Sequence, residues 1–169
     1  WYLWIIYRQK YYQQIKQVFI GTKDKETDEA IFNLKLFKAR KIAENLIYSS
    51  ELSEKEYFYF SSLSTKTIIY KGLLVPEDIE RFYIDLKDSL LVTKLALVHQ
   101  RFSTNTFPSW DLAQPFKMIC HNGEINTVRG NVNWMNARKL AMKSKRLGKD
   151  IKKIWPLIEY GQSDSACFD

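Results

Sequence analysis

Polar, small and aromatic residues are unusually dense in one stretch of the 169-residue chain, Val98–Asn136. At its centre, His121–Glu124 reads His-Asn-Gly-Glu and follows the apolar run Phe116–Cys120, so we expect a strand that ends in a tight turn. The Asn122–Gly123 pair has two interpretations. It is either a simple turn, since both residues tolerate positive φ, or an anion hole in which the Asn amide and the Gly N–H face an oxyanion. The dipeptide alone leaves both open.

Four runs in and around this turn carry a family resemblance. They are His99–Trp110, His121–Thr127, Arg129–Asn131 and Asn133–Met135, and they closely resemble the glutamine amidotransferase domain of the glutamate synthase large chain. The resemblance extends more loosely from about Gln17 to Ser163–Ala166, and no clear match precedes about residue 15. It therefore covers most of the chain and favours the anion hole over the simple turn.

The resemblance implies an α+β fold, part of the four-layer αββα sandwich of N-terminal-nucleophile amidohydrolases. We interpret residues 1–169 as a partial type-2 glutamine amidotransferase domain that lacks the strands carrying the nucleophile. In that family the cysteine at the mature N-terminus attacks the glutamine side-chain amide, with its own α-amino group as the base. Position 1 is Trp, so we expect the chain alone to be inactive.

The resemblance also assigns roles to five residues of a glutamine pocket. Arg101 would clamp the substrate α-carboxylate, a task suited to a planar guanidinium. Asn122 and Gly123 would form the oxyanion hole, and Asp164 would receive the α-ammonium. Thr104 would add a contact to the bound amino acid. Three further polar residues of these runs are expected to position the others: His99, Glu124 and Asn126.

The function implied is release of ammonia from glutamine for a synthase domain of the same chain, which aminates and reduces 2-oxoglutarate to glutamate. The resemblance places FMN and an iron–sulfur cluster in later domains and none in this chain. The electron donor is either ferredoxin or a small subunit that oxidises a pyridine nucleotide, and the location is a bacterial cytoplasm or a plastid stroma. Another class II amidotransferase, such as an amidophosphoribosyl or glucosamine-phosphate enzyme, is the alternative within the family.

A nucleic-acid-binding module is the alternative from another class, because the net charge is +7 and the pI about 9.3. Basic residues are frequent between Arg138 and Lys153. No recognised nucleic-acid motif accompanies them, so we expect a solvated helix and loop and no nucleic-acid partner. No membrane partner is expected either, since Arg8, Lys10 and Lys16 interrupt the apolar opening segment.

The chain has two cysteines, too few for a disulfide framework, and we expect Cys120 and Cys167 to be small buried hydrophobes. Adjacent strand residues point to opposite faces, so Cys120 and His121 are not expected to form a nucleophile–base dyad. These residues and His99 also lack the close spacing of zinc ligands, so no metal site is expected.

The helices and strands that must position these residues can be predicted from the spacing of apolar residues and from the residues that begin or end each element. A helix is expected over Asp28–Leu46, capped by Thr27 or Asp28, with Ile31, Leu34, Ile42 and Leu46 among the residues on its packed face. A second helix should run from Pro76 toward Tyr83, and a third should follow Gly123 as far as Ala141. Strands are expected over three segments: Glu56–Ser62, Thr67–Lys71 and Lys94–Arg101.

Two irregular segments complete the prediction. Pro108 and Pro115 exclude regular helix from the loop around Trp110, which should form a rigid wall. A small polar turn is expected over Gly161–Ser165.

Overall fold

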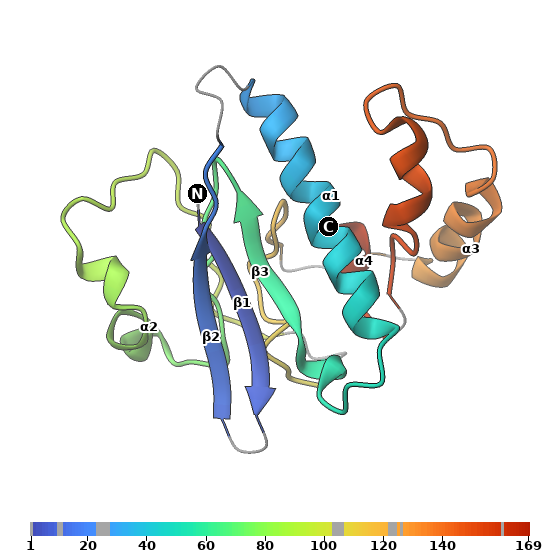
Figure 1. The fold of residues 1–169 in the computed structure, drawn as a ribbon. Coiled ribbons are helices and arrows are strands. Elements are labelled where there is room, and N and C mark those ends of the chain that lie inside the picture. The colour runs from blue at the N-terminus through green and yellow to red at the C-terminus, as the bar shows by residue number, and fades with distance from the viewer. Residues whose placement is uncertain are drawn as a thin grey trace.

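The structure is a computed structural model. It describes residues 2–9, 12–22, 28–102, 107–121, 125, 127–159 and 161–169. Within them, one antiparallel sheet is combined with separate helices, an α+β arrangement (Figure 1).

The sheet has three strands in the order β2-β1-β3. β1 (Tyr2–Gln9) and β2 (Tyr12–Phe19) form an antiparallel hairpin in which Gln9 faces Tyr12, and β3 (Tyr59–Ser64) pairs with the other edge of β1. This hairpin was not predicted. Its signal was two aromatic and β-branched runs separated by only two residues. The strand expected over 56–62 exists but begins later, because Lys55–Tyr57 form a 3-10 turn, η1.

Helix α1 (Glu29–Tyr48) confirms the first predicted helix, and Asp28 is its cap. The Asp28 carboxylate accepts from the N–H groups of Ala30 at 2.6 Å and Ile31 at 3.3 Å. α1 packs along β3 (Figure 1).

The predicted apolar face of α1 is partly wrong: Leu34 and Ile42 are half-buried, but other residues of the face are not. Phe32 and Leu36 are buried, whereas Ile31 and Leu46 are more than half exposed. The helix carries two overlapping apolar stripes, and its place beside β3 decides which of them is covered. The covered side also includes Lys41, which lies 3.4 Å from Glu44 and 3.5 Å from Glu159.

The three other strands predicted in the middle of the chain are wrong. At 67–71, the serine hydroxyls of β3 replace a backbone ladder: Ser61 Oγ donates to the Ile69 carbonyl, and the Ile69 N–H donates to Ser62 Oγ. Residues 95–102 are irregular, with Val98 82% exposed. Phe116–Cys120 contains a tight turn closed by the Phe116 N–H and the Ile119 carbonyl. Apolar runs predicted strands here, but a strand also needs a backbone partner.

The remaining helices follow the predictions more closely. α2 (Pro76–Phe82) begins at the proline, and η2 (Ile84–Lys87) follows it. α3 (Val128–Arg138) is the expected third helix, although it ends before Ala141. Beyond it lies η3 (Gly148–Ile154), where the basic side chains are largely exposed as expected.

The predicted Gly161–Ser165 turn is partly wrong, because a short helix, α4 (Asp164–Phe168), begins inside it. Ser163 caps α4 by accepting from the Ala166 N–H at 3.2 Å. Among the helices of the described ranges, none is long and apolar enough to span a membrane.

Candidate functional site

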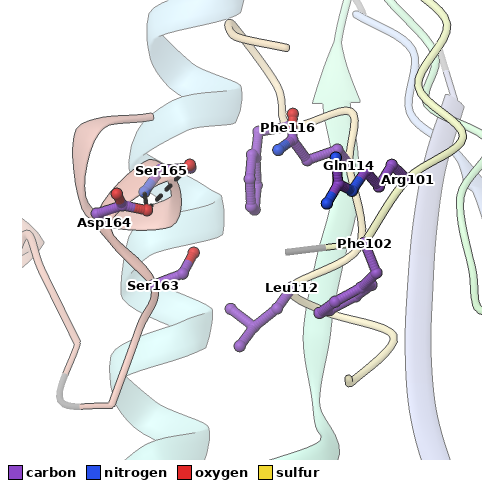
Figure 2. A pocket seen from close by; sticks show the side chains of 8 residues that line it. All are labelled: Arg101, Phe102, Leu112, Gln114, Phe116, Ser163, Asp164 and Ser165. Atoms are coloured by element: carbon purple, nitrogen blue, oxygen red, sulfur yellow. Dashed lines mark hydrogen bonds between the residues drawn. The ribbon is translucent and has the colours of Figure 1, made fainter. Parts of the chain in front are cut away.

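A pocket open to solvent lies between two walls that are far apart in the sequence (Figure 2). One wall comes from residues 101–102 and 112–116 and the other from the start of α4. Its lining consists of Arg101, Phe102, Leu112, Gln114, Phe116, Ser163, Asp164 and Ser165. The structure thus brings Arg101 and Asp164, two of the predicted site residues, to opposite sides of one pocket.

Asp164 is held by three hydrogen bonds. Its Oδ2 accepts from the Ile125 N–H at 2.7 Å, and its Oδ1 accepts from the Ser165 N–H at 2.6 Å and the Ser165 hydroxyl at 3.2 Å. Burial acts to raise the pKa of this carboxyl, but the hydrogen bonds outweigh it and lower the pKa below its usual range. Asp164 is therefore a fixed negative charge at neutral pH.

His121 connects the two walls. The Gln114 carboxamide bonds the backbone of His121 in both directions, donating to its carbonyl and accepting from its N–H, each at 2.9 Å. The His121 ring lies on the other side, with Nε2 2.7 Å from Ser165 Oγ. Gln114 and Ser165 were not predicted as site residues, because nothing in their spacing indicates that they meet at His121.

Comparison with known proteins shows the family of this chain. The family model for "Glutamine amidotransferases class-II" matches residues 7–169. The chain belongs to the class II glutamine amidotransferases. Its curated relatives include the "Glutamate synthase [NADPH] large chain" of Bacillus subtilis, which is 49% identical over 92% of this chain. Others are the "Glutamate synthase [NADH]" of Schizosaccharomyces pombe, 46% identical over 92%, and the "Ferredoxin-dependent glutamate synthase, chloroplastic" of rice, Oryza sativa subsp. japonica, 37% identical over 96%.

This amidotransferase domain is thus homologous to glutamate synthase large chains, as the motifs predicted. It spans 10%, 7% and 10% of the length of these three relatives.

In the amidotransferase domain, a buried lysine supports the wall that carries Arg101. Lys71 is 6% exposed, and its ammonium donates to the Asp111 carbonyl at 2.6 Å. It also lies 5.0 Å from the Phe116 ring centre and 5.4 Å from that of Tyr59. Burial, and to a smaller extent the positive charge of Lys117, lowers the pKa of Lys71 to about 7, against the opposing effects of Asp111 and Asp169.

Trp110 anchors the same wall. Its ring lies 5.6 Å from that of Phe82, and a Cβ atom added at Gly72 would come within 2.5 Å of it. The wall therefore depends on a close approach that glycine permits.

The expectation that both cysteines are buried is wrong, because Cys120 and Cys167 are each half-buried. Cys120 Sγ lies 3.9 Å from the Val98 carbonyl, whereas the His121 ring faces Ser165, so the two side chains form different contacts. The described ranges contain no group of three or more His, Cys, Asp or Glu side chains that could hold a metal.

The other predicted site residues are placed as follows. His99 is half-buried but does not line the pocket. The remaining ones lie outside the described residues: Thr104, Asn122, Gly123, Glu124 and Asn126.

Proposed function

We propose that this domain hydrolyses glutamine within a glutamate synthase and supplies the ammonia with which a synthase domain of the same protein converts 2-oxoglutarate to glutamate. One observation carries the proposal: a guanidinium and a fixed carboxylate, Arg101 and Asp164, line opposite sides of one pocket. The α-carboxylate and α-ammonium of glutamine are a matching pair of charges. The homology with glutamate synthases supports this choice over another class II amidotransferase.

Each charge suits its proposed partner. Arg101 can donate two parallel hydrogen bonds to the substrate carboxylate, because its guanidinium presents a planar fork of donors. Asp164 stays ionised because its pKa is lowered, so it can accept from the substrate ammonium. Thr104 is proposed to add a polar contact to the same amino acid.

In the proposed reaction, a cysteine at the mature N-terminus attacks the glutamine side-chain amide as a thiolate. Asn122 and Gly123 donate to the oxygen that becomes negative during this attack. The C–N bond then breaks as the α-ammonium of the cysteine gives its proton to the departing nitrogen, which leaves as ammonia. Water hydrolyses the thioester and releases glutamate. Neither Cys120 nor Cys167 takes part.

The whole protein is proposed to complete a four-layer αββα sandwich around this domain, in a bacterial cytoplasm or a plastid stroma. FMN and an iron–sulfur cluster are proposed for its other domains. The two cysteines of this chain cannot supply the four thiolates that a typical cluster requires. Electrons come from ferredoxin or from a pyridine nucleotide through a small subunit, since relatives with each type of donor in their names match this chain.

The test compares two nitrogen sources in the intact protein. Arg101→Lys keeps the charge but loses the fork of donors, and Asp164→Asn keeps the shape but loses the charge. Each should raise the KM for glutamine about tenfold or more, because a hydrogen bond to a charged group contributes about 1.5 kcal/mol or more. Synthesis from ammonium and 2-oxoglutarate should be retained. Parallel loss of glutamine-dependent and ammonium-dependent synthesis, with normal circular dichroism, would contradict the proposed pocket.

A further inference from the structure

The positive charge of the chain is concentrated in one short segment. Residues 138–153, which we call the basic lobe, contain eight Lys or Arg and one Asp, a net charge of +7. The whole chain contains 26 basic and 19 acidic residues, so 18 of each sign remain elsewhere and balance one another. The basic lobe therefore carries the entire net charge of +7.

Most cations of the basic lobe have no counterion in the described part of the chain. The one acid of the lobe, Asp150, already pairs with Lys38 at 2.9 Å and with Lys153 at 3.0 Å. Five other cations are exposed and form no ion pair with any described residue: Lys143, Lys145, Arg146, Lys149 and Lys152. Like charges so close together repel one another, so an anionic partner would stabilise them.

A surface of opposite charge lies at the other end of the molecule. Residues 77–88, which we call the acidic lobe, cover most of α2 and all of η2. They contain five Asp or Glu and two Lys or Arg, a net charge of −3. The basic lobe begins at the end of α3 and continues into η3, which packs against α1. Figure 1 shows α2 and α3 at opposite ends, with the sheet and α1 between them, so the two lobes of one copy are far apart.

Both lobes also expose large apolar side chains beside their charges. Leu140 in the basic lobe is 96% exposed, and Trp134, about one turn earlier in α3, is 72% exposed. In the acidic lobe, Ile84 is 72% and Phe82 44% exposed. Apolar anchors with a charged rim are typical of contacts between proteins. A nucleic acid or an anionic lipid surface would account for the basic lobe but not for the acidic one.

We propose that the basic lobe of one copy of this chain binds the acidic lobe of a second copy. The opposite charges orient the two copies, and the apolar anchors of each lobe are covered in the contact. A copy bound in this way keeps one lobe free, so the contact continues into a ring or a chain of copies. The contact weakens as salt rises, because exposed charges are screened.

The experiment measures self-association of the intact, nuclease-treated protein by sedimentation velocity at low and high salt. One variant inverts the basic lobe to a net charge of −3 through five substitutions: Lys143→Glu, Lys145→Glu, Arg146→Glu, Lys149→Glu and Lys152→Glu. The other inverts the acidic lobe to +3 through three: Glu77→Lys, Glu80→Lys and Asp88→Lys. Each variant alone should associate at least about tenfold more weakly than the wild type, because like charges then face each other.

Mixing the two variants should restore association. The first variant keeps its acidic lobe and the second keeps its basic lobe, so the original contact forms between unlike copies. The matched control inverts two exposed cations outside both lobes, Lys35→Glu with Lys94→Glu, and should associate like the wild type.

Three results would overturn the inference: association that neither inversion weakens, association that depends on the basic lobe alone, or no recovery in the mixture. Dependence on the basic lobe alone would indicate a nucleic acid or another anionic partner. If an inverted variant fails to fold, shown by circular dichroism, Leu140→Ser and Ile84→Ser decide. Each removes one apolar anchor and should weaken association several-fold, and unchanged association in both would contradict the contact.

Discussion

The two walls of the pocket are held by different forces. The α4 wall is fixed by hydrogen bonds: both oxygens of Asp164 accept from neighbouring N–H groups, and Ser165 joins it to His121. The Arg101 wall is fixed by packing, with Trp110 against Gly72 and Phe116 over the buried ammonium of Lys71. Arg101 itself is exposed at the edge of the pocket.

Under the proposed function, this difference divides the recognition of glutamine between the two walls. Asp164 is pre-organised, so the substrate ammonium would meet a carboxylate that is already oriented and charged. Arg101 would lose side-chain freedom on binding the substrate carboxylate, and the packed wall below it would limit that loss. The α4 wall should therefore be sensitive to loss of single polar groups, and the Arg101 wall to changes in shape.

The largest effect is expected at Asn122. Asn122→Ala in the intact protein should lower kcat with glutamine about a hundredfold, because it would remove the proposed donor to the charge that appears in the transition state. Steady-state kinetics separates this from binding. A rise in KM at unchanged kcat would mean that Asn122 is only a turn residue.

Gly72→Ala tests the packed wall by shape. The new methyl group would lie 2.5 Å from Trp110, so the ring must shift. Overpacking of this kind costs about 1–3 kcal/mol. Hydrogen exchange of peptides covering residues 107–116 in the intact protein should show faster opening.

Gly21→Ala is the matched control for this substitution, since nothing lies within 4 Å of an added Cβ there. Equal exchange in the two variants would contradict packing as the support of this wall.

Lys71 makes the same wall sensitive to pH. Its pKa is about 7 in the folded state and 10.5 as its ordinary value, so unfolding takes up a proton between these limits. Stability of the wall should therefore rise with pH from about 7 toward 10.5 and be lowest below 7. Between pH 6 and 8 the opening free energy of residues 67–73 should increase by about 1 kcal/mol. Hydrogen exchange corrected for its intrinsic pH dependence measures this, and Lys71→Met should abolish the increase.

Cys120→Ser is expected to have the smallest effect. Cys120 contacts the Val98 carbonyl and does not line the pocket, so kcat and KM for glutamine should stay unchanged in the intact protein. Cys167→Ser provides the comparison. Loss of glutaminase activity in the first variant but not in the second would identify Cys120 as the nucleophile.

Local signals in the sequence were sufficient where a residue acts on its own backbone. Asp28 caps α1 and Pro76 begins α2, and both effects depend only on neighbours in the chain. The other elements depend on contacts with residues that are distant in the sequence. The strand expected at 67–71 failed because serine side chains of β3 took its hydrogen bonds, and the packed face of α1 was chosen by its neighbour.

The site shows the same division. Long motifs identified Arg101 and Asp164, which then proved to share one pocket. The supporting residues Lys71, Gln114 and Ser165 were missed. Their roles arise from contacts with Phe116 and His121 that no local spacing indicates.

The most direct test of the central claim pairs the two variants with two truncated substrates. Glutaramate lacks the α-amino group of glutamine, and 4-aminobutanamide lacks the α-carboxylate. Ammonia release from glutamine and from each truncated substrate gives kcat/KM for the wild-type protein, Arg101→Lys and Asp164→Asn. These values form a double-mutant cycle in which one change is in the protein and the other is in the substrate. We expect Asp164→Asn to cost little with glutaramate and Arg101→Lys to cost little with 4-aminobutanamide, while each retains its full cost with glutamine. The same relative loss on all three substrates would contradict recognition of the two ends of glutamine by Arg101 and Asp164.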